Sequence, residues 1–182
     1  MQYGHSTSYQ AAQKAKSYLL SDKREHHMQQ FQQIPTYLAL LQAKHPDIYS
    51  SLQLENNSTF QRVFICPRES RDSFIHMRKF FAVDGTFLKS RFTQTLLFAV
   101  GIDANGKNLP LAWAVVESEN KDSWTWFLIH LKSAIPEVTG MTLISDRDKG
   151  LLAAEKEVFQ NTIHSLICCF HLKGRMSKNT YF

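Results

Sequence analysis

Phe80-Phe81-Ala82-Val83-Asp84 is a short apolar run that ends in an aspartate, and Gly85-Thr86 follows it at once. The pattern returns later in the chain, where Met141-Thr142-Leu143-Ile144-Ser145 leads directly into Asp146. Such strand ends on neighbouring strands lie ~4.8 Å apart. Together they can hold a divalent cation of the kind used in two-metal phosphoryl transfer. Strand-end aspartates also cap turns and helices, so the pair alone leaves both interpretations open.

The composition predicts one packed globular protein. The chain has 182 residues, is 43% hydrophobic and contains 13 Phe and 3 Trp, which is enough to bury one sizeable core. No apolar run approaches the ~18–20 residues needed to cross a bilayer. The polar start at residues 1–5 does not resemble a signal peptide. We therefore expect no membrane partner.

The cysteines and the net charge restrict the setting further. Cys66, Cys168 and Cys169 form an odd set with two members adjacent, so we expect no disulfide framework and a reducing compartment, cytosol or nucleus. The net charge of +5 permits a nucleic-acid partner without requiring one. The basic residues are modestly concentrated at Arg68, Arg71, Arg78, Lys79, Lys89 and Arg91, and an ordinary solvated surface would look similar.

The first part of the chain predicts helices followed by a hairpin. Ser8 can cap a helix that runs to about residue 20, a Gln-rich stretch covers 21–33, and Pro35 suits the first turn of a second helix through Lys44. Alternation around 52–54 and 60–66 predicts a hairpin, and a short helix is expected over 70–77. We divide this part into an N-terminal helical segment, 1–50, and a hairpin with its short helix, 51–78.

The remaining segment, 79–182, predicts a mixed α/β sheet. Compact apolar runs over 80–84, 95–102, 109–116, 142–145 and 165–168 are expected strands, and the second of them is apolar on both faces, as for a strand covered on both sides. Helices are expected over 123–134 and 149–159, and another near His171. Three antiparallel strands followed by right-handed crossovers place the fourth strand parallel to the first and beside it. Asp84 and Asp146 then meet at one edge of the sheet.

Four motifs in this segment resemble those of Mutator-like element (MULE) transposases. Val83–Lys89 is similar to the family's first-aspartate motif, and Ile144–Leu151 resembles its second-aspartate motif. Residues 110–120 and 122–127 are similar to the segment after the third strand, and Cys168-Cys169-Phe170-His171 matches a Cys-x-x-His signature. The resemblance covers roughly residues 60–172 with the motifs in order.

The resemblance implies an RNase H-like fold and a DDE-type DNA transposase that works in the nucleus on transposon ends. It assigns Asp84 and Asp146 as catalytic, metal-binding acids. Mg²⁺ or Mn²⁺ is the expected cofactor, because carboxylates and water suit a small hard cation. The residues that the motifs place near the site are Gly85, Thr86, Arg147, Lys149, Gly150, Cys168 and His171.

The chain departs from the family pattern in its third acid. In the family this residue lies on a helix well beyond the Cys-x-x-His motif, whereas Glu155 and Glu157 are the only glutamates after Asp146, and both fall in the helix that follows the fourth strand. We therefore expect an incomplete two-ion site, weak sequence-independent DNA binding, and an uncovered sheet edge that favours self-association. The alternative is a catalytically silent, transposase-derived module that binds DNA or protein.

For several polar residues near these motifs, the sequence allows both a functional and a structural role. Asp148 either reaches the metal or caps the next helix, where negative charge is favourable. Arg147 and Lys149 either bind phosphate or are a solvated helix start. Cys168, His171 and His164 are at most half of a structural zinc site. Ser123 is expected to cap the helix over 123–134, with Asp122 as its cap partner.

Overall fold

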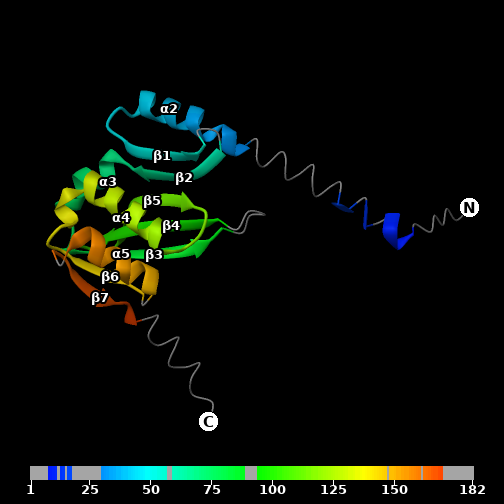
Figure 1. Ribbon diagram of the computed structural model, residues 1–182. Helices are drawn as coiled ribbons and strands as arrows, with labels where there is room; N and C mark the ends of the chain where they lie inside the picture. The colour runs from blue at the N-terminus through cyan, green and yellow to red at the C-terminus, as the bar shows by residue number, and fades with distance from the viewer. Residues whose placement is uncertain are drawn as a thin grey trace, which may run out of the picture.

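The computed structural model describes residues 8–11, 13–14, 16–17, 30–56, 59–88, 94–146, 148–160 and 162–169. Their main feature is one seven-stranded mixed sheet in the order β1-β2-β5-β4-β3-β6-β7 (Figure 1). The strands are β1 (Tyr49–Glu55), β2 (Thr59–Cys66), β3 (Phe80–Phe87), β4 (Thr95–Ile102), β5 (Asn108–Val116), β6 (Thr142–Ser145) and β7 (His164–Ile167).

The pairing follows the predicted order. Neighbours from β1 across to β3 are antiparallel, whereas β3 pairs with β6, and β6 with β7, in parallel. The expectation that the fourth core strand lies parallel to the first and beside it is confirmed. The hairpin of β1 and β2 extends the same sheet through β5, so residues 49–66 belong to it.

Helices accompany the sheet on both sides. They are α2 (Ile34–Lys44), α3 (Arg68–Phe74), α4 (Lys121–Ala134) and α5 (Lys149–Phe159), with a 3₁₀ turn at Pro136–Val138. Figure 1 shows α4 and α5 side by side against one face, and α2 along the β1–β2 hairpin. Among the described helices, none is long and apolar enough to cross a membrane.

The face under α4 and α5 holds the core. Its centre combines alternate residues of the strands with the apolar stripes of the two helices, because successive side chains of a strand point to opposite faces. Fully buried members include Phe64, Phe81, Leu97, Leu111, Trp124, Phe127, Leu128, Leu131, Leu143 and Phe159. Cys66 is buried here as well, and burial raises the pKa of its thiol to about 12.

The opposite face is less covered than the sequence predicts. Along β4, residues alternate between buried and half-buried, and the half-buried set includes Leu96, Phe98 and Val100. The apolar run over 95–102 suggested cover on both sides. In the part of the chain that the structure describes, only the α4–α5 side of this strand is fully buried.

In the first half of the chain, the types of the predicted elements agree with the structure, whereas the ends of one helix differ. The Ala11 N–H donates to Ser8 Oγ at 3.2 Å, as expected of a helix cap. The α2 helix and the hairpin lie where they were predicted. The α3 helix begins and ends earlier than predicted, at Arg68 and Phe74, because Pro67 takes an extended conformation and serves as its N-cap.

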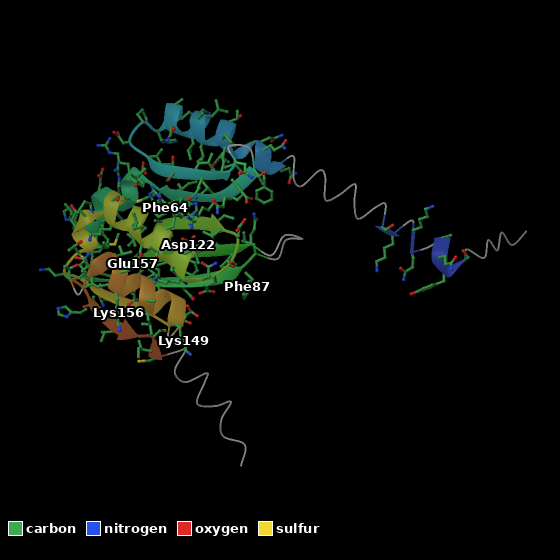
Figure 2. The ribbon with its side chains drawn as sticks, viewed as in Figure 1. Phe64, Phe87, Asp122, Lys149, Lys156 and Glu157 are labelled. Carbon is green, nitrogen blue, oxygen red and sulfur yellow. The ribbon has the colours of Figure 1, made fainter. Side chains whose placement is uncertain are left out.

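The start of α4 corrects a predicted cap. Asn120, not Ser123, is the N-cap residue, and its Oδ1 accepts a hydrogen bond from the Ser123 N–H at 2.9 Å. Asp122 instead pairs with Arg62 of β2 at 2.7 Å, and this nearly buried guanidinium also lies 4.8 Å from the ring centroid of Trp126. Asp122 is labelled in Figure 2. The sequence predicted Ser123 as the partner of Asp122, whereas in the fold its partner is the buried guanidinium of Arg62.

The β7 strand forms one edge of the sheet. All four of its residues are exposed, and Leu166 and Ile167 are exposed apolar side chains. An edge strand of this kind is a template for pairing with another chain. The expected apolar edge is therefore present in the described residues, and self-association stays a prediction.

Candidate functional site

Three strands end at the same edge of the sheet. The β3 and β6 strands are parallel, and β5 runs in the same direction because both it and β3 are antiparallel to β4. The carboxyl ends of these three strands therefore share one edge, and α4 and α5 begin just beyond two of them. Because these strands run in the same direction, the polar residues that follow their ends lie at the same edge.

Asp84 and Asp146 lie level with each other at this edge. The pairing of β3 with β6 matches Phe80 with Thr142 and Ala82 with Ile144, and the same register continued by two residues aligns the two aspartates. Both lie one residue past a buried position, Val83 or Ser145, so both point to the face opposite the α4–α5 layer. The predicted placement of the two aspartates at the ends of adjacent parallel strands follows from this pairing, and a metal shared by their carboxylates stays a prediction.

Each aspartate uses one oxygen locally. Asp84 Oδ1 accepts from the Gly85 N–H at 2.9 Å, and Asp146 Oδ1 accepts from the Asp148 N–H at 2.9 Å. These bonds fix the carboxylates near the backbone. For the Oδ2 atoms, no hydrogen bond or ion pair is present among residues 8–169 where the structure describes them. Within the described residues, one oxygen of each carboxylate is therefore without a partner.

Glu119 joins this edge, and the sequence analysis did not identify it. A Cβ atom at Gly85 would lie 2.9 Å from Glu119 Cδ and 2.9 Å from Glu119 Oε1. The glutamate therefore lies across the backbone of Gly85, directly after Asp84, and approaches the edge from the helix-covered side. A side chain at residue 85 would require this flexible carboxylate to move.

Three aspartates contribute to the electrostatic surroundings of Glu119. Burial raises the pKa of the Glu119 carboxyl, and the negative charges of Asp146, Asp148 and Asp84 raise it further. The Trp124 side chain acts in the opposite direction and lowers this pKa as a hydrogen-bond donor. Glu119 is half-buried, so like charges act on it with less screening than they would in open water.

Trp124 brings a buried donor to Glu119. The residue is fully buried, and its Nε1 has no hydrogen bond of good geometry in the described part of the chain. Its effect on the pKa of Glu119 nevertheless places the N–H close to that carboxylate.

Asp148 is a helix cap. Its Oδ1 accepts from the Gly150 N–H at 2.8 Å and from the Leu151 N–H at 3.0 Å. This bonding pattern satisfies two free amides at the start of α5. Gly150 has a packing role, because a Cβ atom there would lie 2.9 Å from the backbone nitrogen of Lys121 at the start of α4. The absence of a side chain lets the two helix starts approach each other.

The other residues that the motifs place near the site are less closely involved. Thr86 is exposed on β3, and Lys149, labelled in Figure 2, is exposed at the first position of α5. Arg147 and His171 lie outside the described residues. Phosphate binding by Lys149 therefore stays a prediction.

Glu155 and Glu157 lie in α5, the helix after β6, where the sequence predicts them, and both are engaged by other residues. Glu155 is buried, and its two oxygens accept from Ser145 Oγ at 2.8 Å and Ser165 Oγ at 2.5 Å. Glu157 pairs with Lys121 at 2.8 Å and so joins α5 to α4. Glu155 therefore links β6 to β7, and Glu157 links the two helices. Neither serves as a ligand at the edge.

Cys168 and His164 flank β7. Cys168 is half-buried, and its N–H donates to the carbonyl of Ser145 at 2.8 Å, which extends the pairing of β7 with β6. His164 is exposed at the start of that strand. Within the described residues, no three His, Cys, Asp or Glu side chains converge tightly enough to form a ready metal centre, whether for zinc or for magnesium.

A family model for the MULE transposase domain matches residues 80–175, which is more than half of the chain. The chain belongs to the MULE transposase domain family. The match begins with β3 and contains Asp84, Glu119, Asp146 and Cys168, so the acidic edge lies wholly within the family domain.

Curated relatives from Arabidopsis thaliana share low sequence identity with this MULE domain. Protein FAR-RED IMPAIRED RESPONSE 1 is 22% identical over 75% of the chain, and Protein FAR1-RELATED SEQUENCE 6 is 22% identical over 79% of it. The aligned regions make up 16% and 20% of those proteins, so the chain spans a fifth or less of their length.

One solved structure with partial similarity is the simian T-cell lymphotropic virus intasome in complex with PP2A regulatory subunit B56 gamma. The match covers 54% of this chain and 37% of that one, at 13% identity and a TM-score of 0.33. A likeness this low supports no argument about the MULE domain.

The cap role of Asp148 gives a direct prediction. Asp148→Ala should lower the free energy of unfolding by about 1 kcal/mol, because two amides of α5 lose their acceptor. Asp148→Ser, which keeps a capping oxygen, should recover most of that loss. Urea unfolding followed by circular dichroism measures both values. Equal stability of the wild type and Asp148→Ala would show that Asp148 is not a functioning cap.

Proposed function

We propose that the chain carries the metal-binding part of a DDE-type DNA transposase domain with an RNase H-like core. Asp84 and Asp146 are its first two acids, and they bind one divalent cation between them. The proposal includes Mg²⁺ or Mn²⁺ as the cofactor, transposon-end DNA as the substrate of the full-length protein, and a nuclear location.

The observation that carries this proposal is the register of β3 with β6. It sets two aspartates level on adjacent parallel strands, at the edge where three strands end. Two structural caps would have no reason to lie side by side in this way. Asp148 and Asn120 already cap the helices that begin at this edge, so Asp84 and Asp146 are not needed as their caps.

The donor set fits a hard divalent cation. Carboxylate oxygens are the ligands that Mg²⁺ takes from proteins, and Mg²⁺ keeps several of its waters in such sites. When bound, the cation polarises a phosphodiester and activates the attacking oxygen. The chain's own contribution is to hold Asp84 Oδ1 and Asp146 Oδ1 by backbone N–H groups, which restricts the position of each carboxylate.

Substitution of either aspartate should remove metal binding. Asp84→Asn and Asp146→Asn each delete one charged ligand of a two-carboxylate site, and the apparent Kd for Mn²⁺ should rise by at least about 10-fold, the change typical even for outer-shell partners. Asp72→Asn is the matched control, because Asp72 is an exposed residue on α3 and, among the described residues, its ion pair is with Arg68. Calorimetric titration with Mn²⁺ and Mg²⁺ measures the affinities. Equal affinity of all four proteins would refute the proposed site.

DNA binding should be weak and sensitive to salt. A net charge of +5 offers few phosphate contacts, and two of the basic residues are engaged within the protein: Arg68 pairs with Asp47 and Asp72, and Arg71 donates to the carbonyl of Asp47. Each neutralised phosphate should contribute about −0.9 to the log–log salt slope.

Two lysine variants, at opposite ends of the strands, show where DNA binds in this salt titration. Lys149→Gln, at the acidic edge, should make the slope shallower by about 0.9 if Lys149 contacts a phosphate. Lys79→Gln, just before β3 at the other end, should leave it unchanged. Fluorescence anisotropy with an arbitrary duplex at several salt concentrations measures the slope. Tight binding that barely changes with salt would contradict the proposal.

A catalytically silent module is the second candidate function. It is favoured by the lack of three converging ligands in the described residues and by a relative whose name refers to a far-red response.

A cleavage assay of the chain alone can exclude the silent module. We expect no DNA cleavage by it, because an in-line displacement needs two ions held in fixed geometry. A nicking assay with Mg²⁺ or Mn²⁺, beside Asp84→Ala, tests this expectation. Metal-dependent nicking that disappears in the variant would show that these residues suffice for catalysis and would exclude the silent module.

A further inference from the structure

Phe87 is an aromatic residue that the fold leaves in solvent beside the acidic edge. Its side chain is 73% exposed, whereas Thr95, its partner on β4, and Val116, the partner of Thr95 on β5, are fully buried on the same face of the sheet. Figure 2 labels Phe87 at the end of the sheet. Single exposed apolar residues are common on protein surfaces, so the position of this ring decides whether it has a role.

The exposure of Phe87 follows from the unequal lengths of the strands on the two sides of β3. With β4, the pairing continues as far as Phe87, and the Leu88 N–H donates to the carbonyl of Gln94 at 2.9 Å just beyond it. With β6, the pairing covers residues 80–82. The backbone of Phe87 is therefore fixed by regular pairing on one side, and the strand is open on the other. The ring extends from a fixed position and not from an irregular loop.

Phe87 is close to the proposed metal site along the strand. It follows Asp84 on β3 at a distance of about 10 Å, since each residue of a strand advances by ~3.3 Å. The two residues are an odd number of positions apart, so Phe87 lies on the helix-covered face and Asp84 on the more open face. A flexible strand of DNA that crosses the end of β3 can therefore contact both.

The acids at this edge restrict what can bind beside them. Carboxylates repel phosphate groups, so a nucleic acid gains little from backbone contacts here. The face of a nucleobase is uncharged and stacks on an aromatic ring without that repulsion. A base within a duplex is already paired and stacked, whereas an unpaired base reaches another ring at little cost. The chemistry of the edge therefore favours an unpaired nucleotide next to Phe87.

Lys149 supplies the second feature of a single-strand site. It is exposed at the first position of α5, the helix that begins at the same edge. Proteins that bind single-stranded nucleic acid combine cations, which attract the backbone, with aromatic rings, on which the bases stack. A lysine and an exposed ring on either side of the strand ends match this combination, and they distinguish Phe87 from other exposed apolar residues.

We propose that Phe87 is a stacking residue, which receives an unpaired base of a DNA strand where the strand crosses the acidic edge. The inference rests on the proposed function, because it specifies the form of DNA that the same edge takes. That form is a single-stranded end or flap and not a closed duplex. Contact with a protein partner is the other use of an exposed ring, and it is one of the outcomes of the test.

The experiment compares a blunt duplex with the same duplex carrying a short single-stranded extension that contains 2-aminopurine, a fluorescent base. The wild-type chain should bind the extended duplex more tightly, as measured by anisotropy, and stacking should quench the 2-aminopurine fluorescence. Phe87→Ala should raise the Kd for the extended duplex by about 5-fold or more, the lower end of the effect of removing a stacking ring. Its affinity for the blunt duplex should stay unchanged. Phe87→Trp should keep the preference, and Phe87→Leu, which has no ring, should lose it.

Tyr37→Ala is the matched control. Tyr37 is an aromatic residue of α2 that is 58% exposed, and it lies beside Ile65 and Arg68, at the end of β2 away from the acidic edge. Its removal should leave the preference for the extended duplex unchanged. Equal loss of this preference in Tyr37→Ala and Phe87→Ala would overturn the inference. A wild type without the preference, or a Phe87→Leu variant that retains it, would do so as well.

Mn²⁺ binding separates failure of this inference from failure of the proposed function. Phe87→Ala keeps both aspartates, so its affinity for Mn²⁺ should equal that of the wild type. Mn²⁺ binding that depends on Asp84, without a preference for the extended duplex, would overturn the role of Phe87 alone. A wild type that binds neither Mn²⁺ nor DNA would overturn both proposals.

Two further measurements on Phe87→Ala exclude other roles for the ring. Its unfolding temperature should equal that of the wild type, because an exposed side chain contributes little to packing. Its oligomeric state, measured by sedimentation, should also be unchanged. A lower unfolding temperature would assign the ring to folding, and a changed oligomeric state would assign it to a protein contact. Either result would overturn the proposal.

Discussion

The parallel pairing of β3 with β6 is the constraint on which the site depends. Because the side-chain period of a strand is two, a slip of one residue would turn every side chain of β6 to the other face. Asp146 would then point into the α4–α5 layer, and the apolar Leu143 would leave it. The core therefore holds the register, and the register sets Asp84 level with Asp146. Burial of a few apolar side chains thus fixes the positions of two charged ones.

A second set of interactions stabilises the backbone next to the acidic edge. Glu155 accepts hydrogen bonds from Ser145 of β6 and Ser165 of β7. Ser145 directly precedes Asp146, so this bridge lies next to the aspartate. Gly150 lets the start of α5 touch the start of α4, so the two helix N-termini lie together near the edge. Helix N-termini favour negative charge, which offsets part of the repulsion among the acids that gather there.

The sequence predicted the features that depend on local pattern. Alternation and turn signals were enough for the strands, their order and the meeting of Asp84 with Asp146, because strand polarity follows from the lengths of the connections. Partners across the fold were not predictable in this way. Asp122 was expected to have a local partner, yet it pairs with Arg62, which lies on a different strand.

Glu119 was overlooked because it lies in an irregular stretch between a strand and a helix, where acids usually serve as caps. One available signal was strand polarity. The β5 strand runs in the same direction as β3, so residues just after it must reach the edge that Asp84 occupies. The other signal was Gly85, since a glycine beside a strand-end aspartate indicates a close approach by another group. The bare backbone and the burial of Trp124 became informative only when the fold placed them next to Glu119.

The charge of this edge also sets a condition on DNA binding. Four carboxylates gathered at one edge repel a phosphate backbone, and the net charge of +5 is distributed over the rest of the surface. A DNA strand attracted by distant lysines and arginines would therefore be turned away from the acids unless a divalent ion first reversed the local charge. Metal binding would then act before catalysis, as the step that lets a phosphodiester approach the edge at all. If the proposed ion binds here, the carboxylates that hold it would also keep nucleic acid from the site until the ion is bound.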